Sequence, residues 1–186
     1  MQDFLQHASD FLPILLKGAV VTVQVTVLAF LLSSVLGLVL ALGKLSPIKA
    51  VSVVSSAIIN IIRGLPIIVQ LFYIYFVLPD FGIQLSAFQA GVIGLGIAYS
   101  AYQAENFRAG IEAVDPGQRE AALAMGMRPA MLMRRVILPQ AFRIALPPYG
   151  NTLVMMLKDS SLVSTITVAE MTRAGQLIAS STFQNM

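Results

Sequence analysis

The sequence predicts an all-α integral membrane protein, a bundle of several membrane-spanning helices. Hydrophobic residues make up 57% of the chain and charged residues only 11%, whereas a soluble domain carries about 25% charge. The mean hydropathy is +0.81, and residues 18–43 contain no charged side chain. A chain of 186 residues has room for about four spans of roughly 20 residues each. We therefore expect a single transmembrane domain over residues 1–186.

Composition also excludes several kinds of chemistry. The chain has no cysteine, so it forms no disulfide, no thiolate metal site and no cysteine nucleophile. The net charge is only +3, which is too small an excess to predict a nucleic-acid partner. The basic residues are better interpreted as signals for orientation in a lipid bilayer.

The first span is predicted at residues 18–43. Small residues recur at every fourth position within it, at Ser33, Gly37 and Ala41. Such a stripe allows another helix to approach closely. Ordinary usage of glycine and alanine explains the same pattern equally well, so both interpretations stay open.

The second span is predicted at residues 54–79, and Arg63-Gly64-Leu65-Pro66 interrupts it. Glycine and proline together predict a break in the helix. An arginine that faces lipid is costly. Arg63 therefore either marks the start of a shorter span or faces a polar interior, and the sequence does not decide between the two.

The third span is predicted at residues 87–105, and its many small residues are typical of an interior helix. Its polar side chains are candidates for lining a polar interior of the bundle, although tyrosine in a span more often packs or anchors at the interface. These candidates are Tyr99, Ser100 and Tyr102. At the end of the span, Glu105 is expected to pair with Arg108, three residues later.

The fourth span is predicted at residues 148–169, starting after Pro147-Pro148 and broken by Lys158-Asp159-Ser160-Ser161. The rise of a helix puts Asp159 about 18 Å beyond Pro147, near the middle of a core about 30 Å thick. Broken helices at this depth commonly contact the solute in transporters. Asp159, Ser160 and Ser161 are therefore solute-contact candidates, and Asp159 is suited to accept an ammonium group. The alternative is an internal ion pair of Asp159 with Lys158 or Arg63.

The basic residues predict the orientation. Only Lys17 and Arg173 flank the spans on one side, against eight basic residues on the other. These eight are Lys44, Lys49, Arg108, Arg119, Arg128, Arg134, Arg135 and Arg143. Because cytoplasmic loops carry the excess of lysine and arginine, the N-terminus is expected outside and the loop 106–147 in the cytoplasm. The residues after the fourth span then form an external tail that ends at Met186.

The loop 106–147 contains a predicted short helix. Asp115-Pro116-Gly117-Gln118 is typical of a turn, and Glu120–Met125 is a run of strong helix formers that Gly126 closes. Glu120 is expected at the start of this helix, where the positive end of the helix dipole stabilises it. From these features alone, a surface connector is a better explanation of the loop than a binding element.

The order of residues in the loop resembles a known signature. Glu120-Ala121-Ala122, then Gly126, then Leu138-Pro139 resembles the EAA motif of the permease subunits of bacterial ATP-binding cassette (ABC) importers. Val136 stands where that motif has isoleucine. The segments 63–67, 101–111 and 157–162 resemble the branch of the family that takes up polar amino acids, so the resemblance covers nearly the whole chain.

The resemblance implies a fold of the type I ABC importer permease kind, with four spans visible and a fifth expected but absent. It implies that the loop is a coupling helix docking on an ATPase through Glu120, Ala121, Ala122, Gly126, Leu138 and Pro139. It also implies a second permease chain, identical or different, two cytoplasmic ATPase subunits, an external substrate-binding protein and location in the bacterial inner membrane. Arg63 joins Asp159, Ser160, Ser161, Ser100, Tyr99 and Tyr102 as a candidate for the substrate path.

The chain itself is not expected to be an enzyme, because it lacks the glycine-rich phosphate-binding loop of ATPases. No cofactor is expected on this chain, and ATP with magnesium is expected on the partner ATPase. The alternative function is a channel or an ion-coupled secondary carrier that uses Asp159 and Arg63 without any ATPase.

Overall fold

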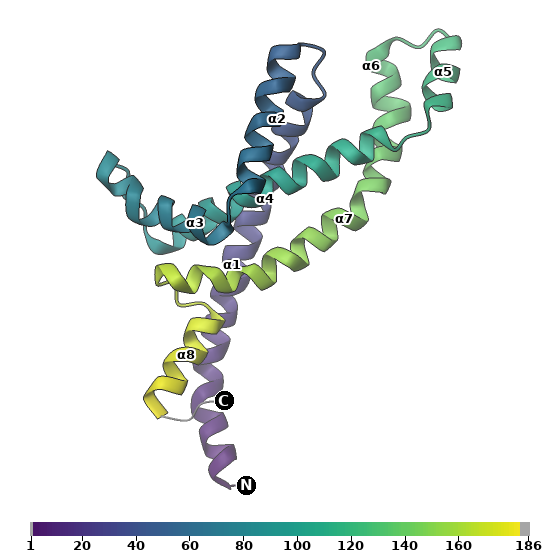
Figure 1. Cartoon of the computed structure of the whole chain (residues 1–186). Coiled ribbons are helices and arrows are strands. Elements are labelled where there is room, and N and C mark those ends of the chain that lie inside the picture. Colours follow the sequence, from purple (N-terminus) through teal and green to yellow (C-terminus); the bar gives the residue numbers. More distant parts are fainter. Residues whose placement is uncertain (1, 183–186) are drawn as a thin grey trace. The chain divides into compact units, whose positions relative to one another are not determined.

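The structure, a computed structural model, describes residues 2–182 and the side chains of residues 11–181. All elements in this part of the chain are helical, as predicted (Figure 1). The end of the predicted tail, residues 183–186, lies outside the described range. The α-helices are α1 (Gln2–Lys44), α2 (Lys49–Gly64), α3 (Ile67–Phe72), α4 (Ala87–Glu112), α5 (Pro116–Ala124), α6 (Pro129–Leu132), α7 (Leu138–Asp159) and α8 (Met171–Thr182). Four π-helical or 3-10 segments accompany them, Tyr73–Val77, Leu78–Phe81, Met133–Ile137 and Ser160–Ile166.

The chain divides into two compact units. The first unit contains the residues up to Leu32, Leu65–Gly96, and the residues from Met155 onward. The second unit contains Ser33–Gly64 and Ile97–Val154. Helices α1, α4 and α7 each contribute one part to each unit. The segment around Asp159 therefore belongs to the first unit, and the loop 106–147 belongs to the second.

One helix of the described chain, Phe11–Lys44, is long and apolar enough to cross a membrane by itself. Two bent pairs, Lys49–Gly64 with Ile67–Phe81 and Pro129–Ile166 with Met171–Ser181, reach this length and hydropathy only if each pair counts as one span. Helix α4 is not among them, because its polar side chains lower its hydropathy. The boundaries of the four predicted spans stay predictions.

The small-residue stripe of α1 forms a helix–helix interface in the second unit. Ser33, Gly37 and Ala41 are all buried. A Cβ atom added at Gly37 would lie 2.6 Å from the Cβ of Gln103 and 2.9 Å from the carbonyl oxygen of Ser100. The backbones of α1 and α4 therefore approach closely here, which confirms the stripe as a packing surface.

The predicted break in the second apolar stretch is confirmed. Helix α2 ends at Gly64, and Pro66 directly precedes α3. The side chain of Arg63 is exposed on this chain, and its guanidinium carbon lies 5.4 Å from the ring centroid of Tyr102. This cation–π contact joins two residues that the sequence suggested separately for the substrate path.

Helix α7, which contains the start of the predicted fourth span, extends further toward the N-terminus than that span. It begins at Leu138 and runs through Pro147 and Pro148 without a break. Each proline removes only one backbone hydrogen bond, and the turns on both sides keep the helix intact. The predicted break is confirmed, since α7 ends at Asp159 and a 3-10 segment follows.

Helix α8 occupies a region that the sequence suggested as an external tail. Its apolar residues Ala174 and Ile178 are four positions apart and both buried. A Cβ atom added at Gly18 of α1 would lie 3.0 Å from the Cβ of Ala174. Residues 171–182 are therefore helical because their apolar stripe packs within the first unit, where Gly18 leaves room for it.

Candidate functional site

Helix α5 carries the EAA segment and has well-defined ends. The Asp115 carboxylate accepts a hydrogen bond of 2.6 Å from the amide of Gly117 and caps the N-terminus of the helix. At the other end, Gly126 adopts a left-handed conformation with φ of 76°. The amides of Gly126 and Met127 donate to the carbonyls of Leu123 and Ala122, at 2.9 and 3.1 Å. These bonds form a Schellman motif, so the predicted closure of the helix by Gly126 is confirmed.

Glu120 does not lie at the start of α5 as expected. The helix begins at Pro116, one turn earlier, and its first turn contains no acidic residue. Proline is favoured at the first helical position for two reasons. Its fixed φ suits the helix, and an amide at this position would have no intrahelical partner, so the missing hydrogen costs no hydrogen bond. Asp115, which the sequence suggested as part of a turn, therefore takes the position next to the positive end of the dipole.

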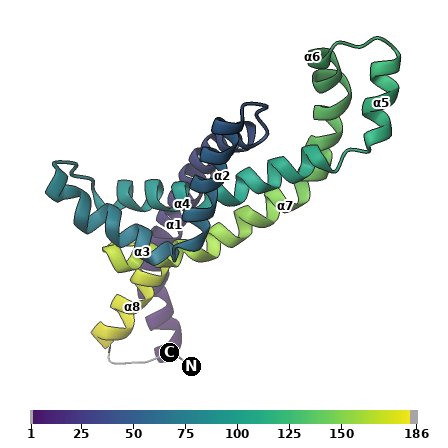
Figure 2. The ribbon, with the colours of Figure 1, turned by 45° about the horizontal axis from the view of Figure 1, so that its top comes forward.

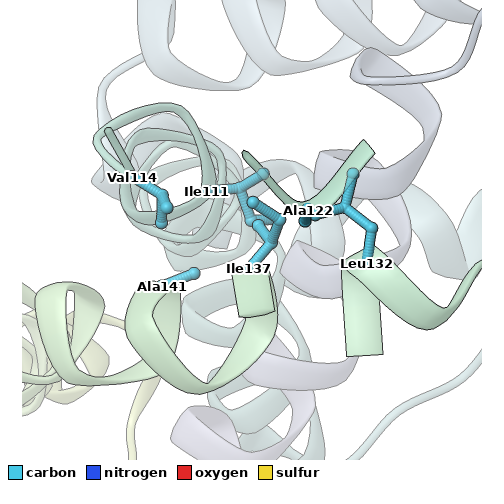
Figure 3. Close-up of a cluster of buried hydrophobic side chains, with 6 residues drawn as sticks. All are labelled: Ile111, Val114, Ala122, Leu132, Ile137 and Ala141. Atoms are coloured by element: carbon cyan, nitrogen blue, oxygen red, sulfur yellow. The ribbon is translucent and has the colours of Figure 1, made fainter. Parts of the chain in front are cut away.

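An apolar cluster fixes α5 to the ends of α4 and α7. Ala122, which is only 6% exposed, packs with buried residues from the adjoining helices and loops. The cluster, shown in Figure 3, consists of Ile111, Val114, Ala122, Leu132, Ile137 and Ala141. In addition, the guanidinium of Arg119 donates to the carbonyl of Ile111 near the end of α4, at 3.2 Å. Ala122 therefore faces the interior of the second unit.

The opposite side of α5 is open. Glu120, Ala121 and Leu123 are exposed, and Met125 is 81% exposed. In both whole-chain views, α5 lies beside α6 at the ends of α4 and α7 within the second unit (Figures 1 and 2). We call the exposed residues Glu120, Ala121, Leu123 and Met125 the outer face of α5. This face is a short, rigid surface of one carboxylate and small or apolar side chains.

The last two residues of the motif lie where α7 begins. Leu138 is exposed and contributes to an apolar groove of about 600 Å³, together with Phe107, Ile111 and Tyr149. Pro139 is also exposed and lies in the first turn of α7. The π-helical turn Met133–Ile137 runs directly into this part of α7, so Pro139 continues a helix that begins earlier in the loop.

A group of charged side chains joins α1 to α4 near the loop. The ammonium of Lys44 lies 2.6 Å from one Glu105 oxygen, and the guanidinium of Arg108 lies 2.8 Å from the other. The pairing of Glu105 with Arg108 is confirmed, whereas the sequence missed Lys44, which is distant along the chain. Arg108 also pairs with Glu112. Its hydrogen bond with Glu105, followed by that with Glu112, raises the pKa of its guanidinium.

The polar segment after α7 borders a cavity in the first unit. Asp159 is half-buried and ends α7, Ser160 is buried, and Ser161 is half-buried. Both serine hydroxyls donate to backbone carbonyls three residues earlier, at 2.7 and 2.9 Å. Ser160 and Ser161 line a cavity of about 620 Å³ with Thr22, Lys158 and Glu170.

Glu170 is a buried charged residue that the sequence did not single out. It is only 1% exposed and accepts hydrogen bonds from the amides of Thr172 and Arg173, at 2.8 and 2.7 Å. It therefore caps α8, a position that serine, threonine, asparagine and aspartate usually take. Because glutamate is not a usual cap and residues 171–182 were not expected to be helical, the sequence offered no signal for this role.

The remaining candidates lie in the second unit. Tyr99 and Ser100 are buried, and the Ser100 hydroxyl donates to the carbonyl of Ile97 at 2.7 Å. The rings of Tyr99 and Tyr102 pack with centroids 5.7 Å apart, and Arg63 lies over Tyr102. The structure thus brings Arg63, Tyr99 and Tyr102 together. Asp159, Ser160 and Ser161 form a separate group in the first unit.

Comparison with known proteins gives consistent matches. Residues 33–185 match the family described as binding-protein-dependent transport system inner membrane component. The probable amino-acid ABC transporter permease protein y4tG of Sinorhizobium fredii is 43% identical over 96% of this chain and 78% of its own length. The L-cystine transport system permease protein TcyB of Bacillus subtilis is 41% identical over 95% of this chain and 74% of its own length.

Solved structures match the fold. An amino acid ABC transporter with histidines superposes with a TM-score of 0.91 and 46% identity, over 95% of this chain and 82% of that chain. The inward-facing MetNI methionine ABC transporter, at 23% identity, has a TM-score of 0.77 over 93% of this chain and 83% of that chain. The chain therefore belongs to the family of inner membrane components of binding-protein-dependent transport systems, and it has the helical fold of the ABC importer permeases.

Proposed function

We propose that this chain is the permease subunit of an ATP-driven importer that moves a polar amino acid into the cytoplasm by alternating access. The observation that carries the proposal is the construction of α5. One side, through Ala122, is packed into the ends of α4 and α7, and the other side is open. A short helix with one packed face and one exposed face is suited to bind a partner. When the partner moves this helix, α4 and α7, which pack against it, move as well.

The partner on the outer face of α5 is a cytoplasmic ATPase subunit. Glu120 supplies a charge for pairing, while Ala121 allows close approach and Met125 an adaptable apolar contact. Gly126 ends the helix sharply through its left-handed conformation. ATP and magnesium bind to that partner, and this chain performs no covalent chemistry.

The assembly contains two permease chains, two ATPase subunits and an external binding protein that delivers the solute. The names of the relatives support amino acids as the solute class, since they refer to amino acids and L-cystine. The positive-inside rule supports an external N-terminus and a cytoplasmic loop 106–147.

The solute passes the polar segment that follows α7. Asp159 accepts the α-ammonium group, and Ser160 and Ser161 line the adjoining cavity, whose volume of about 620 Å³ is ample for one amino acid. In the second unit, Ser100, Tyr99, Tyr102 and Arg63 are the further candidates for the path. The contact with the Tyr102 ring is suited to keep the guanidinium of Arg63 away from lipid.

Reconstitution in proteoliposomes tests the proposal. The chain with its ATPase and binding-protein partners is expected to import radiolabelled amino acids only when ATP is supplied. Glu120→Ala is expected to reduce ATP-driven import at least several-fold. Import that persists without the ATPase subunits would instead support the channel or secondary carrier, in which Asp159 and Arg63 act without ATP.

A further inference from the structure

One side chain of α4 reaches across to α7 in the second unit. The Asn106 amide nitrogen lies 2.9 Å from the hydroxyl oxygen of Thr152 and 3.5 Å from the carbonyl oxygen of Pro148. It also lies 3.2 Å from the side-chain oxygen of Gln103, on its own helix. The Thr152 hydroxyl donates in turn to the Pro148 carbonyl, at 2.9 Å. We call Asn106, Pro148 and Thr152 the α4–α7 clasp.

The clasp lies beside the two prolines that interrupt the hydrogen bonds of α7. Pro147 and Pro148 lie inside this helix, and neither has an amide hydrogen, so the carbonyls of Arg143 and Ile144 lose their usual donors four residues on. Interior prolines are the commonest places where helices bend. Asn106 binds just beyond this point and so connects the far side of the prolines to α4.

Between the clasp and α5, helices α4 and α7 approach each other closely at Gly110. A Cβ atom added at Gly110 of α4 would lie 2.8 Å from the carbonyl oxygen of Ala141 and 2.9 Å from the Cβ of Ala145 in α7. Closer to α5, the apolar cluster around Ala122 fixes the helix to both α4 and α7. Such a close approach, made possible by a glycine, leaves the two helices little room to slide at this point.

We propose that Asn106 is a positioning residue that carries the displacement of α5 past Pro147 and Pro148 to the polar end of α7. Thr152 precedes Asp159 by about two helical turns, so a movement held at Thr152 reaches the proposed solute segment. Without Asn106, α7 bends at the prolines and absorbs the movement. This inference rests on the proposed coupling role of α5 and adds the route inside the chain.

The experiment uses the complete transporter in proteoliposomes, with a radiolabelled mixture of the common L-amino acids and L-cystine as the probe. Asn106→Leu removes the donor at similar volume, and Thr152→Val removes its partner hydroxyl without a change of shape. Asn151→Leu, at an exposed position beside Thr152, is the matched control. The measured quantities are the rate of ATP hydrolysis and the amount of amino acid imported per ATP hydrolysed.

Asn106→Leu and Thr152→Val are each expected to keep ATP hydrolysis within about twofold of the wild type. Each is expected to lower import per ATP about three- to tenfold, since one or two half-buried hydrogen bonds are lost. The double variant is expected to lose no more than the worse single variant. If Asn106→Leu does not assemble, Thr152→Val alone decides.

An unchanged ratio in the assembled variants, or an equal loss in Asn151→Leu, refutes the role of Asn106 while leaving the proposed function intact. Wild-type liposomes without ATP-dependent import refute the proposed function itself.

Discussion

The contrast between Ala121 and Ala122 offers a sharp test of how α5 is held. Ala122 is 6% exposed within the apolar cluster, and its neighbour Ala121 is exposed. Aspartate at either position lowers helix propensity by the same amount, about 0.6 kcal/mol. At Ala122 it also buries an unpaired carboxylate, which costs about 3 kcal/mol more. Since 1.4 kcal/mol corresponds to a factor of ten, Ala122→Asp is expected to open α5 roughly 100-fold more often than Ala121→Asp.

Hydrogen–deuterium exchange of the chain in lipid nanodiscs measures this opening, followed on peptides that cover residues 116–127. Exchange is expected to accelerate strongly in Ala122→Asp and only slightly in Ala121→Asp. Equal acceleration in both variants, or none in Ala122→Asp, would show that the apolar cluster does not hold α5 in place.

Three further predictions concern packing, backbone conformation and charge. Gly37→Ala is expected to lower the midpoint of thermal unfolding because the added Cβ lies 2.6 Å from an atom of α4. Gly150→Ala, whose added Cβ has nothing within 4 Å, is expected to leave the midpoint equal or higher. The same shift at both sites would contradict the close packing at Gly37. Gly126→Val forces a branched residue to a φ of 76° and is expected to cost about 1–3 kcal/mol. Gly126→Asn costs less, and similar exchange protection of α5 in both variants would argue against the Schellman closure. Glu105→Gln removes the ion pair with Lys44. The thermal unfolding midpoint of this variant is expected to approach that of the wild type as salt is raised to about 1 M, because salt screens the ion pair. A difference that does not depend on salt would show that the ion pair does not stabilise the fold.

Features that follow from local rules were predictable from the sequence. The stripe at Ser33, Gly37 and Ala41, the break at Gly64 to Pro66 and the closure of α5 by Gly126 each depend on residues close together along the chain. Spacing at helical intervals and the conformational freedom of glycine are enough to identify them.

Features that depend on tertiary contacts were missed. The continuation of α7 through Pro147 and Pro148 was not predicted because prolines usually end a helix, whereas here the packed turns before and after them keep it continuous. Helix α8 was not expected because its helical state depends on packing in the first unit beside Gly18. The contacts of Lys44 with Glu105 and of Asn106 with Thr152 join residues far apart in sequence, and no local pattern predicts them.

Cross-linking from α5 tests the central claim most directly, that its outer face contacts the ATPase. The chain contains no cysteine, so a single cysteine can be placed in the assembled transporter without background. Met125 is 81% exposed on the outer face, and Phe81 is 70% exposed between the second and third predicted spans. With the N-terminus outside, this connection is expected on the external side of the membrane. A short bifunctional reagent is expected to join Met125→Cys to the ATPase subunit and to leave Phe81→Cys unlinked to it. Absence of the Met125→Cys product while ATP-driven import persists, or a Phe81→Cys product of equal yield, would contradict this account of coupling.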